Sequence, residues 1–439
     1  MLQLRPEGPD LFDSLLPPEL QKLPDELARV DELLQDERFM MPFIMRFNET
    51  KGRPSIPVAT YLRLMYLKFR YKLGYETLVQ EVSDSITWRR FCGVSYQQRV
   101  PHSTTLIKLT EKYGEESLGE LHELIIENLH KRKLIRGRKL RADTTVVASN
   151  IHYPTDAGLL YDGLRRLRQG LVKVRGVGLR LGRTMKKAKT LIFTIAQTLR
   201  KTDERSREKV RRLNRKMVRM VKKTIVKVRR VLKNIPEGPV RKHIETTLDL
   251  SGEVAQQSEE RLAGGKPTDK IVSLVDSGAR AIVKGKLDKP VEFGRTCLVT
   301  QDEGGYFTQY GVHRSNPGDS TLLKGIVETH QGQFPGALKD VAVDMGFSSE
   351  DNYNLLKKEG VTGLGMPWRG KAPPNIQAKQ KRPRFKKLMA FRAGMEGSLS
   401  FLSRKFGLKR SMLRGDAGTG IWVAWGIIAA NLYRFGKGP

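Results

Sequence analysis

The stretch RKLRADTTVVASNIHYPTD, residues 138–156, decides the fold class because it indicates a β-strand. An acid, Asp143, stands at the start of this strand. Residues 144–147 of this run are Thr, Thr, Val and Val, and such β-branched side chains fit the pleated surface of a sheet. Asn150 and Pro154 mark its end. An acid beside a strand usually does no more than start or end it, so the meaning of Asp143 depends on whether the rest of the chain supplies partners.

The net charge of the chain indicates a polyanionic partner. Its 439 residues are enough for two or three domains, and 80 Lys and Arg against 47 Asp and Glu leave a net charge of +33. Nucleic acid is the commonest such partner, because each phosphate that a protein neutralises releases condensed counterions. An anionic membrane would favour a basic helix with bulky apolar residues, and aromatic residues are only 7% of this chain. Ribosomal and chaperone-like basic proteins share this charge, so composition alone leaves them open.

Cysteine usage and hydropathy indicate where the protein works. Cys92 and Cys297 are too few for a disulfide framework and too far apart for a metal-binding Cys-x-x-Cys pair, which indicates a reduced cytosol. The N-terminal MLQLRPEGPD lacks the apolar core of a signal peptide, and the longest apolar run, residues 421–433, is shorter than the ~20 residues of a membrane span. We therefore expect a cytoplasmic, nucleoid-associated protein that does not enter the membrane.

The first third of the chain is predicted to be helical. Residues 1–55 are interrupted by prolines and are expected to form an arm with one short helix. Residues 56–135 have helical spacing, with VATYLRLMYLKFRYKLG (58–74) ending at a Gly and YETLVQEVSD (75–84) following at once. Two helices joined by a tight turn are the outline of a helix-turn-helix. The pattern fits an all-α, helix-turn-helix-like DNA-binding domain and a plain helical bundle about equally well, and the net charge favours the first.

Residues 161–265 are predicted to form a helical insertion whose first part is strongly basic. Residues 161–235 contain 26 Lys and Arg against four acids, which is two thirds of the excess of the whole chain. Apolar residues keep helical spacing over 210–232, so this helix is amphipathic with an almost wholly positive outer face. A block of like charge can also be a mobile tail, but we expect this face to contact DNA phosphates. We expect four cations of this face to contact DNA: Lys222, Lys223, Arg229 and Arg230.

The rest of the chain is predicted to be a mixed α/β domain made of residues 136–160 and 266–439. Strands are expected over 270–285, 295–315, 336–346 and 360–368, and helices over 319–334, 348–360 and 391–407. Strands that alternate with helices in this way indicate a sheet covered by helices. The basic insertion then lies between the first strand and the others, and it need not disturb the sheet if its two ends lie close together.

Two further acids complete a candidate metal site with Asp143. Asp344 ends the apolar run DVAVD (340–344), and in open α/β sheets ligands bind at the carboxyl ends of strands. Glu396 lies in a helical run, with Arg392 one turn before it. Three carboxylates brought together repel one another unless a cation neutralises them, and hard oxygen ligands select Mg²⁺ or Mn²⁺. Two such ions would activate a water or a 3′-hydroxyl and stabilise the leaving oxygen of a phosphodiester.

Five blocks of sequence resemble, in this order, the catalytic blocks of bacterial insertion-sequence transposases of the DDE type. They are RADTTVVASNIHYPTDAGLL (141–160), KGKLDKPVEFG (284–294), VAVDMGFSSEDNYNLL (341–356), FRAGMEGSLSFLSRKFGL (391–408) and GTGIWVAWGIIAANLYRF (418–435). The likeness extends over most of residues 50–439. It implies a ribonuclease-H-like mixed sheet flanked by helices, with Asp143, Asp344 and Glu396 as the metal-binding catalytic acids.

The helix of the third acid departs from the family pattern. Related transposases often carry a Tyr, Arg, Glu, Lys series on this helix. Arg392 and Glu396 keep the spacing, whereas Met389 stands at the Tyr position and Ser403 at the Lys position, followed by Arg404. The resemblance implies that Arg392 contacts the phosphate of the scissile strand, and Arg404 is expected to be a further DNA contact.

These observations lead to a metal-dependent transposase as the expected function. Its expected partners are double-stranded DNA, both the ends of its element and the target, and a second copy in a homodimer. No Walker-type G-x-x-x-x-G-K-[ST] motif occurs in the sequence, which agrees with transesterification that needs no nucleotide. Two alternatives stay open: a non-catalytic DNA-binding protein, and a metal-dependent nuclease that only hydrolyses.

Several other residues have two interpretations. Trp368 follows a strand and precedes a basic loop, so it is either a core residue or a platform for an unpaired base. His313 is either structural or close to the scissile phosphate. Four more acids are interpreted as caps at strand ends and turns, where Asp is common: Asp276, Asp302, Asp319 and Asp340.

Overall fold

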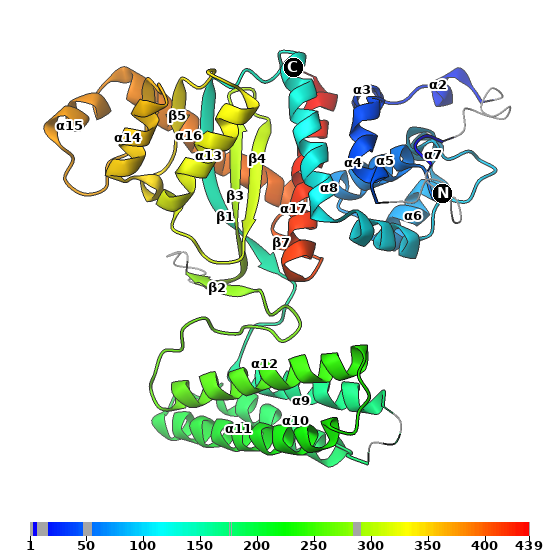
Figure 1. Cartoon of the computed structure of the whole chain (residues 1–439), viewed down its shortest axis with the longest axis vertical. Coiled ribbons are helices and arrows are strands. Elements are labelled where there is room, and N and C mark those ends of the chain that lie inside the picture. Colours follow the sequence, from blue (N-terminus) through cyan, green and yellow to red (C-terminus); the bar gives the residue numbers. More distant parts are fainter. Residues whose placement is uncertain are drawn as a thin grey trace. The chain divides into compact units, whose positions relative to one another are not determined.

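Figure 1 shows the computed structural model, which describes residues 3–6, 16–46, 55–174, 176, 178–283 and 291–438. Packing divides the chain into two compact units. One consists of Met1–Ala148 with Arg295–Pro439, and the other is Ser149–Gly294. The first unit contains most of a mixed sheet, and the second consists mainly of a helical bundle.

The sheet is built around its first strand, β1. The strands are β1 (Lys139–Ser149), β2 (Arg280–Val283), β3 (Val291–Asp302), β4 (Phe307–His313), β5 (Asp340–Ala342), β6 (Gly363–Gly365) and β7 (Arg410–Ser411). They follow the order β2-β3-β1-β5-β6, with β4 paired to β3 and β7 paired to β1. The β3–β4 pair is an antiparallel hairpin, whereas β5 is parallel to both β1 and β6. This mixed sheet is compatible with the ribonuclease-H-like arrangement that the resemblance implies.

The start of β1 differs from the prediction. Leu140 and Ala142 are buried in one hydrophobic cluster, and Asp143, on the other face, is half-buried. A turn at Gly137, whose φ is +66°, precedes the strand, and a Cβ at that position would come within 2.7 Å of a packed phenyl ring. Asp143 therefore lies inside a strand that begins at Lys139, and the expectation that it stands at the start of the strand was wrong.

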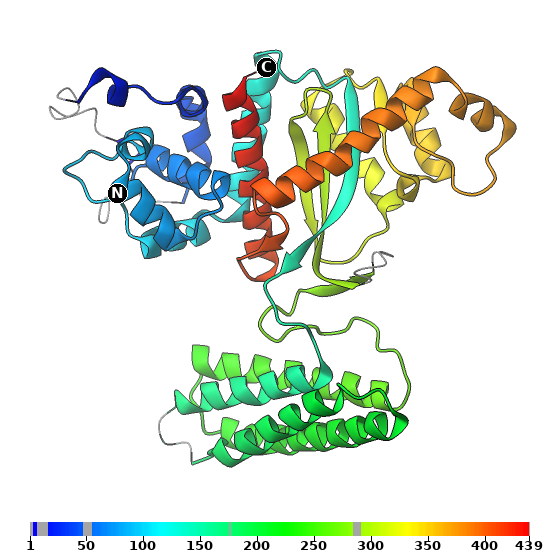
Figure 2. The same cartoon turned by 180° about the vertical axis from the view of Figure 1, so that it is seen from behind.

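Helices cover both faces of the sheet. They are α13 (Asp319–Gln333), η2 (Met345–Phe347), α14 (Glu350–Lys358), α15 (Pro374–Gln380), α16 (Pro383–Lys405) and α17 (Gly415–Lys437). The long helix α16 crosses one face, where it packs on β5 and β6 (Figure 2). Helix α13 lies on the other face (Figure 1). The edge at which β5 ends therefore lies between these two helical layers.

The N-terminal helices share a core with α17. They are α2 (Pro18–Gln21), α3 (Asp25–Leu34), η1 (Glu37–Met40), α4 (Met41–Ile44), α5 (Val58–Arg70), α6 (Tyr75–Asp84), α7 (Ile86–Cys92) and α8 (Ser103–Lys131). The apolar helix α17 packs against α3, α5 and α8, and their buried side chains belong to the largest hydrophobic cluster. Helix α5 is buried along almost its whole length. It therefore has little surface with which to contact a partner.

The second unit is dominated by a bundle of α9 (Asp156–Val172), α10 (Gly182–Thr198), α11 (Glu204–Leu232) and α12 (Pro239–Leu262), seen in Figure 1. The four helices enclose an apolar core of their own. On α11, Leu213, Met217, Val221 and Val228 are buried, so the amphipathic helix predicted over 210–232 is confirmed. A helix of this composition is held by packing of its apolar stripe, because its outer face is almost entirely Lys and Arg.

Three smaller expectations concern the remaining segments. Within 270–285 only Arg280–Val283 form a strand, and residues 284–285 lie outside the described residues. Cys92 and Cys297 are both buried and form no disulfide. In the described part of the chain, no helix combines the length and the apolar character that crossing a membrane requires.

Candidate active site

The parallel pairing of β1 with β5 brings two of the predicted acids to the same edge of the sheet. The register pairs Arg141 with Ala342. If this register continued for two more residues, Asp143 would lie opposite Asp344, and neighbouring strands are about 4.8 Å apart. Both side chains are half-buried. Strand pairing thus brings the segments that carry these two acids, 201 positions apart in sequence, onto adjacent strands.

Asp344 begins a tight turn directly after β5. It caps η2, and its Oδ1 accepts a hydrogen bond from the backbone N–H of Gly346 at 2.8 Å. The chain then enters α14, whose capping residue Ser349 accepts a hydrogen bond from the Asn352 N–H. Two successive caps hold this segment in place. The Asp344 carboxylate therefore has a defined direction at the carboxyl end of the strand.

Thr144 links Asp143 to an acid that the sequence analysis interpreted as a cap. The Thr144 backbone N–H donates to Asp143 Oδ1 at 2.7 Å, and the Thr144 hydroxyl donates to Asp319 Oδ1 at 3.0 Å. Asp319 is the first residue of α13, where the helix dipole favours an acid. Its position is that of an ordinary first-turn acid, so no signal in the sequence distinguished it from the other three caps.

Gly346 lies between the carboxylates of Asp319 and Asp344. A Cβ built on Gly346 would stand 2.8 Å from Asp319 Oδ2 and 3.0 Å from Asp344 Oδ1. Both oxygens therefore border the same small space. The glycine leaves this space open, and any side chain at residue 346 would have to displace one carboxylate or the other.

Glu396 lies on α16, and its side chain is 69% exposed. Its Oε1 is 3.4 Å from Nη1 of Arg392, one turn before it. On another side of the same helix, Arg141 of β1 donates to the Ser398 hydroxyl at 3.2 Å. Because a helix turns about 100° per residue, Glu396 lies on the far side of α16 from Ser398.

One side of α16 is turned to the end at which β1 begins. Gly394, Gly397 and Ser398 line a cavity together with Gly304 and Gly305, the turn of the β3–β4 hairpin. This turn lies where β1 begins, since the Lys139 N–H donates to the carboxylate that precedes it in the hairpin. Glu396 therefore lies on the side of α16 away from this cavity. Among the described residues, however, no group of three or more His, Cys, Asp or Glu side chains is gathered closely enough to hold a metal ion.

The two predicted DNA-contacting arginines of α16 differ in their surroundings. Arg392 keeps its side chain only 21% exposed beside Glu396. Arg404 is exposed in the last turn of the helix and lines a hollow at the end of α5. Twelve residues along one helix separate them, which is about 18 Å. They cannot both contact one phosphate.

The four cations predicted to contact DNA from α11 are exposed, but they divide into two pairs. Lys222 and Arg229 form ion pairs with acids of α12, at 2.5 and 3.8 Å. Lys223 and Arg230 each lie one residue further on and point about 100° further around the helix. Within the residues that the structure describes, neither of these two forms an ion pair.

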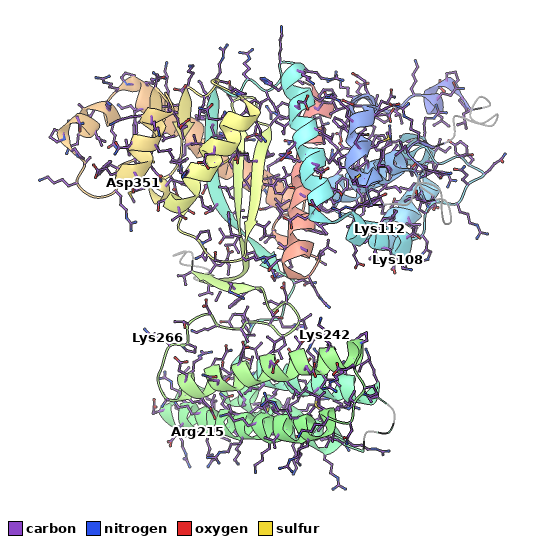
Figure 3. All side chains as sticks on the ribbon, in the orientation of Figure 1. Lys108, Lys112, Arg215, Lys242, Lys266 and Asp351 are labelled. Carbon is purple, nitrogen blue, oxygen red and sulfur yellow. The ribbon has the colours of Figure 1, made fainter. Side chains whose placement is uncertain are left out.

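Charge is unevenly distributed over the bundle. Helices α10 and α11 carry 17 Lys and Arg against two acids, whereas α9 and α12 carry six against seven. Arg215 is one of the exposed cations of α11 (Figure 3). Helix α6, which would be the recognition helix of a helix-turn-helix, has three acids and no Lys or Arg. The surface best suited to phosphate is therefore on the bundle.

The other residues with two interpretations have ordinary structural surroundings. Trp368 packs on Tyr353, with ring centroids 5.0 Å apart. His313 is half-buried, and burial lowers its pKa. Asp302 is fully buried at the end of β3, and burial raises its pKa to about 6. Asp340 starts β5 in an ion pair with an arginine of α16 at 2.6 Å.

Comparison with known protein families matches two parts of the chain. Residues 17–112 match a family described as "Transposase domain (DUF772)", and residues 285–432 match one described as "Transposase DDE domain". The second match includes Asp344 and Glu396, and the basic bundle lies outside both. No curated protein matches the chain, and no solved structure matches it.

Proposed function

Because the chain belongs to the insertion-sequence transposases of the DDE type, we propose that it cleaves phosphodiester bonds at the ends of its own element and joins the freed 3′-hydroxyl to target DNA. The observation that supports this most is the parallel pairing of β1 and β5. Its register, if continued by two residues, would set Asp143 beside Asp344 at one edge of the sheet. In our proposal Glu396, on α16, completes the site with these two acids.

The chemistry of the three predicted acids suits a divalent metal. Asp143, Asp344 and Glu396 offer only carboxylate oxygens, the hard donors that Mg²⁺ and Mn²⁺ prefer. In our proposal these three residues hold the metal, which supplies activation of the attacking oxygen and stabilisation of the leaving oxygen. The backbone N–H groups of Thr144 and Gly346 each bind one oxygen of a strand acid and so keep it oriented.

Arg392 would position the DNA strand that reacts. Its guanidinium is partly buried and lies one turn from Glu396, so it is held close to the acid. A guanidinium presents parallel N–H donors that match two oxygens of a phosphate. We assign to Arg392 the contact with the phosphate next to the reacting bond.

The basic bundle would hold DNA by its backbone. The outer face of α11 is almost wholly Lys and Arg, and these side chains contact phosphates more readily than they read base edges. Helix α11 lies next to α10, which has four Lys and Arg and no acid. In our proposal this side of the bundle contacts double-stranded DNA, and Lys223 and Arg230 belong to it.

The test replaces each acid without changing its shape. Asp143→Asn, Asp344→Asn and Glu396→Gln should each lower the rate of cleavage at a duplex carrying the element's ends by at least ~100-fold, because each removes a metal-binding charge. Binding to the same duplex in a gel shift should remain, since losing an acid does not weaken attraction to phosphate. Asp351→Asn, an exposed acid in the first turn of α14 (Figure 3), is the matched control and should cleave normally.

Three outcomes would contradict the proposal. One is cleavage at the wild-type rate by any of the three acid variants. Another is a wild-type enzyme that cuts the ends but never yields strand-transfer products with a supplied target, which would make it a hydrolytic nuclease. A protein that binds the ends without cutting them under any divalent metal would be a DNA-binding protein only.

A further inference from the structure

We propose that a cation-lined hollow between the ends of α5 and α16 binds a phosphate of the DNA backbone, a few nucleotides from the reacting bond. This inference rests on the proposed function, because it takes the DNA to be the strand that reacts at Glu396. The hollow has a volume of about 580 Å³. It is lined by Arg70, Tyr71, Lys72, Phe401, Arg404 and Lys405.

Three of the four cations in the hollow are available to a ligand. Lys72, Arg404 and Lys405 are exposed, and within the described residues none of them forms an ion pair. Arg70 is different, because Glu26 holds it at 2.7 Å. Three positive charges around one small hollow, with no acid in its lining, suit an anion that carries several acceptor oxygens. For a DNA-binding chain that anion is the phosphodiester.

The position of the hollow along α16 fits a phosphate of the reacting strand. Arg404 follows Glu396 by eight residues, which is about 12 Å along the helix axis. One strand of duplex DNA advances about 3.4 Å per nucleotide along its axis. A strand whose reacting phosphate lies at Glu396 and that runs along α16 would therefore bring a phosphate roughly three or four nucleotides away to Arg404.

A purely structural explanation covers part of this charge. Arg404 and Lys405 lie in the last turn of α16, where the helix dipole favours cations. Lys72 is not explained in this way. It follows α5 with a left-handed φ of +56°, and the next N–H, that of Leu73, bonds back to the Lys68 carbonyl. Gly fills such a position at lower cost, so a lysine there reduces stability while adding charge to the hollow.

The chain contains a matched control for Lys72. Helix α8 ends in the same motif, with Lys133 at a φ of +61° and the Leu134 N–H bonded to the Leu129 carbonyl. Lys133 is also exposed, but it does not line the hollow. Replacing either lysine by Gly relieves the same backbone strain and removes the same charge. Only Lys72→Gly removes a charge from the hollow.

The first experiment compares Lys72→Gly with Lys133→Gly. Both variants should melt at a slightly higher temperature than the wild type, by roughly 2 °C, because the strain is relieved. Only Lys72→Gly should weaken binding to an end-bearing duplex, flattening the slope of log K against log salt by roughly 0.9. Equal slopes in the two variants would overturn the inference. Lys72→Arg keeps the charge and should keep the wild-type slope.

The second experiment locates the phosphate. Single phosphates of the end duplex are replaced, one at a time, by neutral methylphosphonates, and binding is measured for the wild type and for an Arg404→Gln, Lys405→Gln double variant. One replacement about three or four nucleotides from the cleaved bond should weaken the wild type several-fold and leave the double variant unaffected. Replacements that act equally on both proteins at every position would overturn the inference. If the wild type itself bound no DNA, the proposed function would fail instead.

Discussion

At the residue scale, the candidate site depends on a hydrogen bond that joins positions 175 residues apart. The Thr144 hydroxyl donates to Asp319, while the Thr144 amide donates to Asp143. Gly346 leaves room for the oxygens of Asp319 and Asp344 side by side. An acid that starts a helix is thus hydrogen-bonded to the residue that orients Asp143, and it borders the same space as Asp344. Groups that orient metal ligands in this way commonly matter almost as much as the ligands.

Disturbing these contacts of Asp319 should weaken metal binding without removing a ligand. Thr144→Val deletes the hydroxyl that contacts Asp319, and Gly346→Ala introduces a Cβ into the space beside both carboxylates. Each should raise the dissociation constant for Mn²⁺, measured from the EPR signal of the free ion, by about 10- to 100-fold. Thr144→Ser keeps the hydroxyl and should bind normally. Gly325→Ala, in α13 with open space around it, is the control for the second change.

The opposite result would support the interpretation that the sequence suggested, in which Asp319 is a cap. Unchanged Mn²⁺ affinity in both Thr144→Val and Gly346→Ala, with folded proteins by circular dichroism, would mean that Asp319 only caps α13.

At the element scale, the exposed cations of α11 form two lines along the helix with different surroundings. Lys216, Lys223 and Arg230 follow one another at seven-residue spacing, so they form one line over about 21 Å. Lys222 and Arg229 form another line, which faces the acids of α12. Exposed ion pairs of this kind contribute only about 0–1 kcal/mol to stability. The first line is left for an outside partner.

The two lines of α11 should therefore respond differently to neutralisation. Changing Lys216, Lys223 and Arg230 together to Gln should weaken binding to specific and random duplexes alike. The slope of log K against log salt should flatten by roughly 0.9 for each phosphate that the variant no longer neutralises. Changing Lys222 and Arg229 to Gln should leave the slope almost unchanged. Loss of specific binding alone would instead make α11 a recognition element, and equal effects of both sets would remove the distinction between the lines.

At the scale of the whole molecule, the chain consists of two compact units with separate cores. The bundle has its own apolar cluster, which no residue of the sheet or of the N-terminal helices joins. The chain enters this unit after Ala148 and leaves it before Arg295. A unit with its own core and a single entry and exit is expected to fold by itself.

A fragment of residues 155–264 should fold alone. It contains the four helices from the capping residue Thr155 to the end of α12, and its free energy of unfolding should be at least about 5 kcal/mol. Urea denaturation followed by circular dichroism measures this directly. The rest of the chain, with 156–262 replaced by a Gly/Ser linker, should still bind Mn²⁺ but should lose much of its salt-dependent affinity for DNA. A fragment without cooperative unfolding would show that the bundle depends on the other unit.

Much of the architecture could be predicted from local pattern. The helical spacing of 210–232 predicted α11. The one strand expected over 295–315 is instead the β3–β4 hairpin, because the chain turns at Gly305, whose φ is +76°. The start of β1 could not be predicted, because residues 139–141 pair with β5, and strand propensity depends on such neighbours.

The residues themselves also identified the family, through blocks that include Asp143, Asp344 and Glu396, and they located the basic helix. They could not distinguish Asp319 from three ordinary caps, Lys222 from Lys223, or Lys72 from other surface lysines. Those distinctions depend on what each side chain contacts. Asp319 accepts a hydrogen bond from the Thr144 hydroxyl, Lys222 pairs with an acid of α12, and Lys72 lines a hollow with the end of α16. Spacing along a chain determines which residues share a face, since helices and strands have fixed periods. What that face meets is decided by packing between segments far apart in sequence, so only the tertiary structure could show it.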